Sequence, residues 1–282
     1  MSVVRVKVPA TTANIGPGFD CLGIALRVYN WVTIFRAEGG VLDGIFAEAA
    51  EAFFKKTEEI PFAFNWKITG QVPRSRGLGS SVTVRLGVLH GLNALIGAPL
   101  KHQEIFELCA ELEGHPDNAA PAAFGGFTIA RGGASVQRYK VDRRAEFVLL
   151  IPDFEVATPE ARRVLPETVP LADAVLSAGN ASAIAAAFAT RSYEALAGCF
   201  EDRLHQPYRQ ALVPFLPSVI EAGVKVGALG GWLSGSGSTV ACLTLGNGAQ
   251  VAEAMLAACG NAGAKTIVTL ADNTGVRVYR RD

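Results

Sequence analysis

The sequence predicts an α+β protein with two domains. The first observation is length, because 282 residues correspond to about two domains of ordinary size. The second is order, since segments with strand and helix patterns follow one another without the regular alternation of a doubly wound sheet. The third is composition: half of the residues are apolar and 15 of them are Phe, enough for sizeable cores and inconsistent with global disorder.

The charge balance excludes several classes of partner. The 26 Lys and Arg residues equal the 26 Asp and Glu residues, which leaves no electrostatic footprint for nucleic acid or an anionic membrane. The N-terminal residues lack the apolar core of a signal peptide, and no stretch of about 18 uncharged apolar residues occurs. The five cysteines are far apart and form no C-x-x-C pair, so we expect small buried apolar groups. We therefore expect a cytoplasmic protein with no nucleic-acid or membrane partner.

The first half of the chain combines strands and helices. Residues 3–8 alternate and are β-branched, and residues 25–35 place aromatic side chains on one face, so both segments predict strands. Residues 42–56 carry apolar side chains at helical spacing. Residues 62–69 predict a strand that follows Pro61. Residues 82–96 predict a helix in which Gly87 and Gly91 are the weak points.

The second half continues the mixture. Helices are predicted over residues 103–112, 172–190, 193–200 and 249–259, and strands over residues 127–130 and 147–151. Residues 114–118 form a polar turn. We place a change of domain near residues 145–155, which gives domains of residues 1–150 and 151–282, although no low-complexity linker marks the boundary.

Residues 72–81, VPRSRGLGSS, meet three physical needs of a phosphate-binding loop. Glycines let the backbone approach an anion, consecutive N–H groups can point at it, and the following helix directs its positive end there. The Walker A pattern does not fit, because no Lys follows Gly79. A glycine-rich turn with a Ser N-cap is the alternative that the segment alone leaves open.

Two more glycine-rich loops occupy residues 14–18 and 233–238. Each one alone is typical of a turn. A packed core, however, does not need Asn14 and Asp20 beside a Gly-Pro-Gly turn, nor three serines interleaved with glycines after residue 233. Together the three loops favour a ligand site.

Several segments resemble the homoserine kinases of the GHMP kinase superfamily. Residues 9–23, PATTANIGPGFDCLG, resemble the first homoserine kinase motif, and residues 73–81 resemble the superfamily phosphate loop P-x-x-x-G-L-G-S-S. Residues 113–121 resemble the family segment before a mid-chain helix, and residues 233–240 resemble the third superfamily motif. Residues 158–162 and 206–209 resemble the arginine-bearing segments of homoserine kinases. The matches follow the family order over residues 9–240.

The resemblance implies a two-domain GHMP kinase fold with ATP and Mg²⁺ in the cleft. Its N-terminal domain carries the phosphate loop and is ribosomal protein S5 domain 2-like, and its C-terminal domain is ferredoxin-like. It implies phosphorylation of the hydroxyl of L-homoserine by ATP to O-phospho-L-homoserine, a step of threonine biosynthesis, and a homodimer. A GHMP kinase for another small carboxylate-bearing alcohol is the alternative, and an inactive binding protein with the same loops is a third reading.

The resemblance also assigns the nucleotide and metal residues. Ser81 and Glu113 correspond to the ligands of Mg²⁺, a cation that seeks oxygen donors. The residues that correspond to the ATP site are Pro73, Arg74, Ser75, Arg76, Gly77, Leu78, Gly79, Ser80, Ser81, Val82 and Thr83.

The expected substrate residues match the chemistry of homoserine. Arg162 and Arg209 would hold its carboxylate, since guanidinium groups suit bidentate recognition. Asn14 and Asp20 would accept from its ammonium group. The remaining expected substrate residues are Asn118 for the hydroxyl, His115 in the same turn, and Gly235.

Asn118 and Arg162 are also the expected catalytic residues. The loop at residues 13–18 has no Lys, whereas mevalonate kinase and other GHMP kinases use an Asp with a Lys there. We therefore expect catalysis by positioning and charge stabilisation without a dedicated base, which phosphoryl transfer tolerates.

Three features depart from the family pattern. The segment between residues 35 and 62 looks short, and Asp43 stands where the family tends to have an Asn that faces adenine, so the base pocket stays undefined. The third motif reads G-S-G-S where G-[A/S]-G-P is usual. Arg85 shares a predicted helix face with Ser81 and Leu89, and either snorkels to solvent or forms a salt bridge with an acidic residue of the neighbouring helix.

Overall fold

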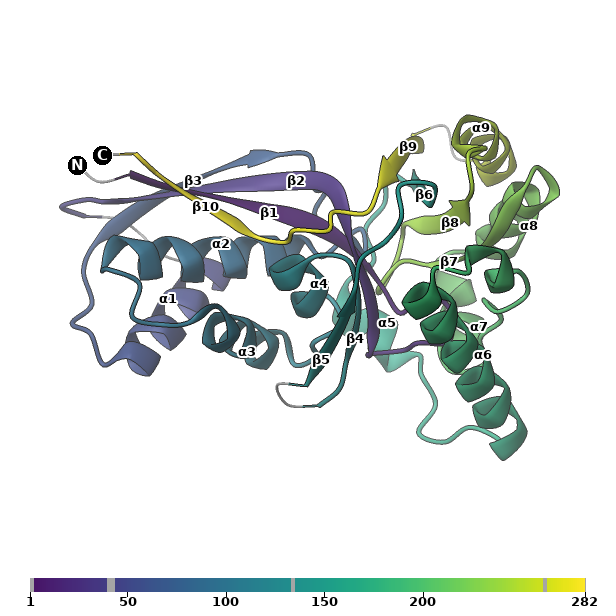
Figure 1. The fold of residues 1–282 in the computed structure, drawn as a ribbon, viewed down its shortest axis with the longest axis horizontal. Coiled ribbons are helices and arrows are strands. Elements are labelled where there is room, and N and C mark those ends of the chain that lie inside the picture. Colours follow the sequence, from purple (N-terminus) through teal and green to yellow (C-terminus); the bar gives the residue numbers. More distant parts are fainter. Residues whose placement is uncertain (1–2, 40–43, 133–134, 261–262, 282) are drawn as a thin grey trace.

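The computed structural model describes residues 3–39, 44–132, 135–260 and 263–281. It shows two sheets side by side, each covered by helices, and the molecule is elongated along the line that joins them (Figure 1). Strands and helices are mixed as the sequence predicts, so the α+β class is confirmed.

The first sheet has six strands in the order β10-β1-β2-β4-β5, and β3 pairs with β2 off this path. Val4, Val6 and Val8 of the first strand are buried while Arg5 and Lys7 are half-buried, the alternation that predicted a strand. The strands are β1 (Val3–Ala13), β2 (Leu22–Arg36), β3 (Phe64–Gly70), β4 (Phe127–Ala130), β5 (Val136–Tyr139) and β10 (Arg277–Arg281).

Four helices pack on this half of the molecule: α1 (Gly44–Thr57), α2 (Ser80–Leu95), α3 (His102–Glu113) and α4 (Ala119–Phe124). α2 is the central one and is buried along most of its length. Its two glycines are packing residues, because a Cβ atom at Gly87 would lie 2.3 Å from Val32 and one at Gly91 would lie 2.5 Å from Ile34. The positions that weaken the helix pattern therefore let α2 lie close on the sheet.

The second sheet has four strands in the order β7-β8-β6-β9, all antiparallel. The strands are β6 (Glu146–Ile151), β7 (Ala228–Leu233), β8 (Val240–Thr244) and β9 (Lys265–Leu270). One face packs on α8 (Leu216–Lys225) and α9 (Gly248–Cys259). The other faces α6 (Leu171–Thr190), where Phe188 lies in one apolar cluster with Phe147 and Trp232. Shorter elements connect these: α5 (Thr158–Arg163), η1 (Tyr193–Leu196), α7 (Gln206–Arg209) and η2 (Gln210–Leu212).

The two sheets do not divide the chain in sequence order. β6 begins before residue 150 and lies in the second sheet, while β10, at the end of the chain, pairs with β1 in the first. The two ends of the chain consequently lie next to each other (Figure 1). The division into residues 1–150 and 151–282 stays a prediction.

Local expectations are mostly confirmed, with one clear correction. The predicted helix over residues 193–200 is only the single 3₁₀ turn η1, because Ala197 is extended and Gly198 has a positive φ of 81°. For the helix predicted over residues 42–56, the first two residues lie outside the described ranges, and α1 begins at Gly44. All five cysteines are free thiols; three are buried as expected, and Cys21 and Cys199 are half-buried.

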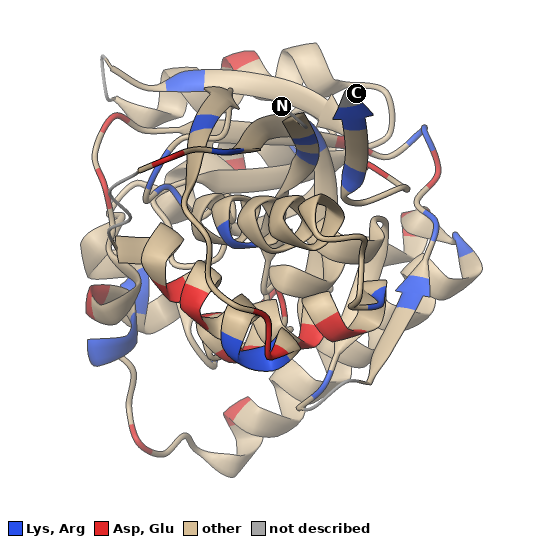
Figure 2. Ribbon diagram, turned by 90° about the vertical axis from the view of Figure 1, so that its left-hand side faces the viewer, with Lys and Arg blue, Asp and Glu red and all other residues tan. Residues whose placement is uncertain are grey.

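Charge and hydropathy add two observations. Basic and acidic residues are interspersed over the ribbon in Figure 2, in keeping with the zero net charge. By length and composition, α6 is long and apolar enough to cross a membrane. Its Ile184 and Phe188 pack into the cluster with the second sheet, whereas Leu171 and Val175 are exposed. The absence of nucleic-acid and membrane partners stays a prediction.

Candidate active site

A cavity of about 690 Å³ opens where the three glycine-rich loops meet. The Nδ2 atom of Asn14 donates to the carbonyl of Gly235 over 3.0 Å, although the two residues are 221 positions apart. The hydroxyl of Ser234 donates to the carbonyl of Gly77 over 2.7 Å. The loops that looked like three separate turns in the sequence thus form one lining.

The phosphate loop has the backbone geometry of an anion site. Gly77 and Gly79 have φ values of 69° and 65°. A Cβ atom would lie 1.9 Å from the carbonyl of Ser234 at the first position and 2.1 Å from the hydroxyl of Thr11 at the second. α2 begins immediately afterwards, and the N–H groups of its first turn have no acceptor within the helix. This is the arrangement that binds phosphates at helix N-termini.

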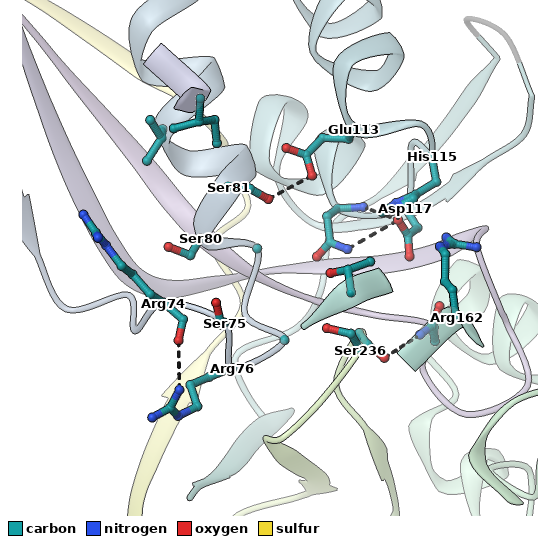
Figure 3. Close-up of a pocket in the computed structure, with 18 of the residues that line it drawn as sticks. Arg74, Ser75, Arg76, Ser80, Ser81, Glu113, His115, Asp117, Arg162 and Ser236 are labelled. Carbon is teal, nitrogen blue, oxygen red and sulfur yellow. Dashed lines mark hydrogen bonds and ion pairs between the residues drawn. The ribbon is translucent and has the colours of Figure 1, made fainter. Parts of the chain in front are cut away.

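The predicted ATP residues divide into two groups. Those that line the cavity are Arg74, Ser75, Arg76, Gly77, Gly79, Ser80 and Ser81. Those that are not part of the lining are Pro73, Leu78, Val82 and Thr83. Because the side chains of Leu78, Val82 and Thr83 are buried, any contact they make with a nucleotide must come from the backbone. Figure 3 shows Arg74, Ser80 and Ser81 on one side of the cavity, and His115, Asp117 and Arg162 on the other.

Arg76 joins the two halves of the molecule. Its Nε donates to the carbonyl of Pro152 over 2.9 Å, and its Nη2 to the carbonyl of Asp153 over 2.6 Å. It also pairs with Glu155 at 3.3 Å. These contacts attach the phosphate loop to the segment that follows β6 in the second sheet.

Ser81 and Glu113 form a compact oxygen pair. The hydroxyl of Ser81 donates to Oε2 of Glu113 over 2.9 Å, as Figure 3 shows. Oε1 of the same carboxylate accepts from Arg85, whose Nη2 also donates to Glu48 over 2.7 Å. Of the two alternatives for Arg85, the salt bridge is confirmed. The carboxylate comes from the last residue of α3 and the hydroxyl from the first turn of α2, and both are oxygen donors of the kind that Mg²⁺ prefers beside phosphates.

Asp20, Arg162 and Arg209 bring charge to the other side of the cavity. Arg162 donates to both carboxylate oxygens of Asp20, over 3.1 and 2.8 Å. Arg209 is buried, and its Nε and Nη1 donate to the carbonyls of Ala161 and Gly235 over 3.0 and 3.2 Å. Burial lowers the pKa of Arg209 to about 10, which keeps the group charged at neutral pH. The two guanidinium carbons lie 5.6 and 5.2 Å from the ring centre of Phe19, and the positive charge of Arg162 further lowers the pKa of Arg209.

The polar turn between α3 and α4 contributes a third group. Nδ1 of His115 lies 2.8 Å from Oδ1 of Asp117, and this hydrogen bond raises the pKa of His115. The same oxygen accepts from the backbone N–H of Asn118 over 2.9 Å. Thr11 in turn donates to Oδ1 of Asn118 over 2.6 Å, which fixes the direction of the amide. Asp117, which the sequence reasoning missed, therefore orients both predicted residues.

Asn14 has mainly a structural role, because its side chain is hydrogen-bonded within the protein. Its backbone has a positive φ of 69°, its Nδ2 donates to Gly235, and its Oδ1 accepts from the N–H of Asp20 over 3.1 Å. The side chain thus joins the first loop to the third and places Asp20. Like Gly235, it lines the cavity.

The structure adds residues at the side of the cavity that the sequence left undefined. Phe46 of α1 and Trp66 of β3 stack with ring centres 3.6 Å apart, and both line the cavity together with Val84. Their aromatic character on a predicted helix and a predicted strand was the only available signal, and a core role explained it equally well. Asp43 lies outside the described residues. Thr158 and Ser236 also line the cavity; both lie in segments singled out in the sequence, although neither was named as a site residue.

One group of side chains has the composition of a metal site. Ligand atoms of Asp20, His115 and Asp117 lie within 4.8 Å of one another. The guanidinium of Arg162 already occupies the carboxylate of Asp20. Glu113 is also paired with an arginine, but its hydrogen-bond partner Ser81 lies in the first turn of α2, directly after the phosphate loop, so this pair is the better place for a divalent cation that binds together with phosphates.

Comparison with known proteins identifies the class to which this fold and site belong. Residues 44–126 match a family model described as the GHMP kinases N terminal domain, and residues 181–261 match one described as the GHMP kinases C terminal. A mevalonate kinase crystal structure superposes with a TM-score of 0.72 at 14% identity, which shows a shared fold. The two-domain GHMP kinase fold is thereby confirmed. The protein is therefore a phosphotransferase that uses ATP.

Closer relatives narrow the family. A homoserine kinase of Trichormus variabilis is 41% identical over 288 residues and covers 95% of both chains. One of Prochlorococcus marinus is 38% identical over 279 residues, which cover 90% of this chain and 88% of the relative. A crystal structure of homoserine kinase from Cytophaga hutchinsonii superposes with a TM-score of 0.90 at 25% identity, covering 98% of this chain and 97% of that one. The chain belongs to the homoserine kinase family of the GHMP kinases.

Proposed function

We propose that the protein transfers the γ-phosphoryl group of ATP to the hydroxyl of L-homoserine and releases O-phospho-L-homoserine, ADP and the proton of the hydroxyl. The observation that carries the proposal is the charge arrangement opposite the phosphate loop. Arg162, Arg209 and Asp20 surround Phe19 in the cavity that the phosphate loop also lines. The family membership agrees with this substrate.

Homoserine matches the charges of this region in detail. Asp20 and Arg162 form a direct ion pair, and a zwitterionic amino acid can replace that pair by placing its ammonium beside Asp20 and its carboxylate beside Arg162 and Arg209. The exchange leaves the total charge of the site unchanged. The hydroxyl, two carbons beyond, then reaches toward the amide of Asn118, with His115 in the same turn.

The phosphate side would hold ATP mainly through backbone groups. The phosphates would lie against the glycine-rich loop and the first turn of α2. Ser81 and Glu113 would hold Mg²⁺, which supplies charge neutralisation at the phosphates when bound. The adenine would lie toward Phe46 and Trp66, the apolar part of the lining.

The residues around the hydroxyl support catalysis by positioning. Oδ1 of Asp117 already accepts from His115 and from both nitrogens of Asn118. Asn118 would orient the hydroxyl of the substrate. Arg162 would hold the substrate while negative charge develops on ADP, the leaving group. A loose phosphoryl-transfer transition state asks mainly for alignment and neutralisation, so no dedicated base is required. The proposal also includes a cytoplasmic location, a place in threonine biosynthesis and a homodimer.

The substrate assignment can be tested with homoserine and its decarboxylated analogue 3-aminopropanol. ATP consumption is followed in a coupled assay, and the product is identified by ³¹P NMR. We expect O-phosphohomoserine from homoserine and poor turnover of the analogue, because a charge-assisted hydrogen bond to the carboxylate contributes about 1.5–3 kcal/mol. Arg162→Ala and Arg209→Ala should hardly change the weak reaction of the analogue, since the group they bind is absent.

Equal turnover of homoserine and 3-aminopropanol would refute the carboxylate site. Turnover of a different hydroxy acid in preference to homoserine would keep the site and change the substrate to another carboxylate-bearing alcohol.

A further inference from the structure

Arg85 places a fixed positive charge beside the residue proposed to hold Mg²⁺. It lies on α2 one turn after Ser81, and Glu113 is the last residue of α3. Its Nη1 donates to Oε1 of Glu113, and its Nη2 donates to Oε2 of Glu48 over 2.7 Å. Held by carboxylates of two different helices, the guanidinium has a defined position next to the metal residues.

The ion pair divides the carboxylate of Glu113 between two partners. Oε1 accepts from Arg85, whereas Oε2 accepts from Ser81 over 2.9 Å. The side chains of Glu113 and Arg85 are only 8% and 13% exposed, so solvent ions screen their attraction less than at the surface. Only Oε2 is left for a metal, and much of the negative charge is already neutralised.

We propose that Arg85 is a positioning residue that fixes Glu113 for coordination through one oxygen and weakens its affinity for a free divalent cation. The inference rests on the proposed function, in which Glu113 and Ser81 hold Mg²⁺. A guanidinium close to a divalent cation repels it. The negative charge of the ATP phosphates offsets that repulsion, so Mg²⁺ binds firmly only together with the nucleotide.

The experiment measures binding of the metal alone to the nucleotide-free protein. Mn²⁺ serves as the probe, because oxygen donor sites for Mg²⁺ also accept it, and its free concentration is followed by electron paramagnetic resonance at constant ionic strength. Arg85→Gln keeps a hydrogen-bond donor and removes the charge, and Arg85→Lys is the matched variant that keeps the charge. Circular dichroism checks that each variant is folded.

We expect Arg85→Gln to lower the Kd for Mn²⁺ at least tenfold, which corresponds to about 1.4 kcal/mol. Arg85→Lys should stay within about threefold of the wild type, since the charge that repels the metal is retained. Adding Glu113→Gln to Arg85→Gln should abolish the gain. In activity assays at saturating ATP, the Mg²⁺ concentration for half-maximal rate should fall in Arg85→Gln and not in Arg85→Lys. If Arg85→Gln does not fold, Arg85→Met must show the same gain.

Two results would overturn the proposal, and they differ in what they leave standing. Equal Mn²⁺ affinity of the wild type and the neutral variants, with binding lost in Glu113→Gln, would refute the role of Arg85 and keep the metal site. Mn²⁺ binding that Glu113→Gln leaves unchanged in every background would refute both, because the metal would then lie elsewhere, for instance at Asp20 and Asp117.

Discussion

The two sides of the cavity present charge in different ways. On the side proposed to hold the nucleotide, Gly77, Gly79 and the start of α2 present backbone N–H groups within one continuous segment. On the substrate side, Asp20, Arg162 and Arg209 come from distant segments and act through side chains. Asp20 and Arg162 are 142 positions apart in the chain.

The difference follows from the ligands. Phosphates carry several negative oxygens in a repeated arrangement, which a turn and a helix N-terminus can bind without any particular side chain. An amino acid carries one ammonium and one carboxylate group. Its recognition requires an acidic and a basic side chain whose spacing matches the spacing of these two groups. We therefore expect substitutions on the nucleotide side to act through backbone shape, and substitutions on the substrate side to act through charge.

The largest effect is expected for Gly79→Val. This position has a positive φ, which valine rarely adopts, and the Cβ of the new residue would lie 2.1 Å from the hydroxyl of Thr11. ATP affinity, measured by calorimetry, should fall at least ~100-fold because the N–H groups of the loop would no longer converge. Circular dichroism should show an unchanged fold.

Gly97→Val is the matched control for this prediction. Gly97 also has a positive φ, of 93°, but no atom lies within 4 Å of its added Cβ. It should lose some stability and keep its ATP affinity. Near-normal ATP binding by folded Gly79→Val would contradict the assignment of the phosphate loop.

Smaller effects are expected when either substrate-side arginine is removed. Arg162→Ala and Arg209→Ala should each raise KM for homoserine about 10- to 100-fold and leave KM for ATP almost unchanged. The two should differ in stability. Arg209→Ala removes the side-chain donor to the carbonyl of Ala161 and one of the two donors to the carbonyl of Gly235 in a buried place, so its Tm should fall by roughly 4 °C or more, whereas that of half-exposed Arg162→Ala should change little. Equal changes of KM for both substrates would show that the arginines do not separate the two sides.

The smallest effect concerns pH and His205, which lies behind the substrate side. It is fully buried, stacks on Phe19, and lies 3.2 Å from Nη1 of Arg209 and 3.4 Å from Asp202. Burial lowers the pKa of His205, an effect that Asp202 opposes and Arg209 reinforces. Because the folded pKa lies below the ordinary value of about 6.5, the stability that neutral His205 confers is present above that pH and is lost as the pH falls toward the folded pKa.

The measurement is the Tm between pH 7.5 and pH 5. The wild type should lose several degrees over this range, and His205→Gln, whose amide does not titrate, should lose less. Parallel curves for the two proteins would contradict the prediction, since titration of His205 would then play no part.

Residues 193–200 and the glycine-rich loop at residues 14–18 show where sequence reasoning succeeds and fails. The apolar pattern of residues 193–200 predicted a helix, but Gly198 and the burial of Tyr193, whose hydroxyl accepts from the N–H of Asp142, reduce it to one 3₁₀ turn. The loop at residues 14–18 was predicted as part of a ligand site, and its Asn14 lines the cavity, while ligand binding by this loop stays a prediction. Its glycines and Asn14 indicate a special backbone, which is a local property.

Two contacts of the site were outside the reach of any local pattern. Phe46 and Trp66 are ordinary core residues by type, and only the packing of α1 on β3 stacks them beside the cavity. Asp117 stands in a recognised polar turn, but its hydrogen bonds to His115 and Asn118 depend on how that turn closes.

The sequence by itself determined the α+β class, the three glycine-rich loops, the presence of the helix α2 and the residue types proposed to bind phosphate and an amino acid, because periodicity and backbone preference act over a few residues. Three contacts were decided only by the tertiary structure. β10 pairs with β1, Arg162 forms an ion pair with Asp20, and Arg85 forms an ion pair with Glu113 where it could have extended into solvent. Those choices join segments far apart in the chain. They depend on which burial and charge pairing offsets the entropy of closing long loops, and no single segment contains that information.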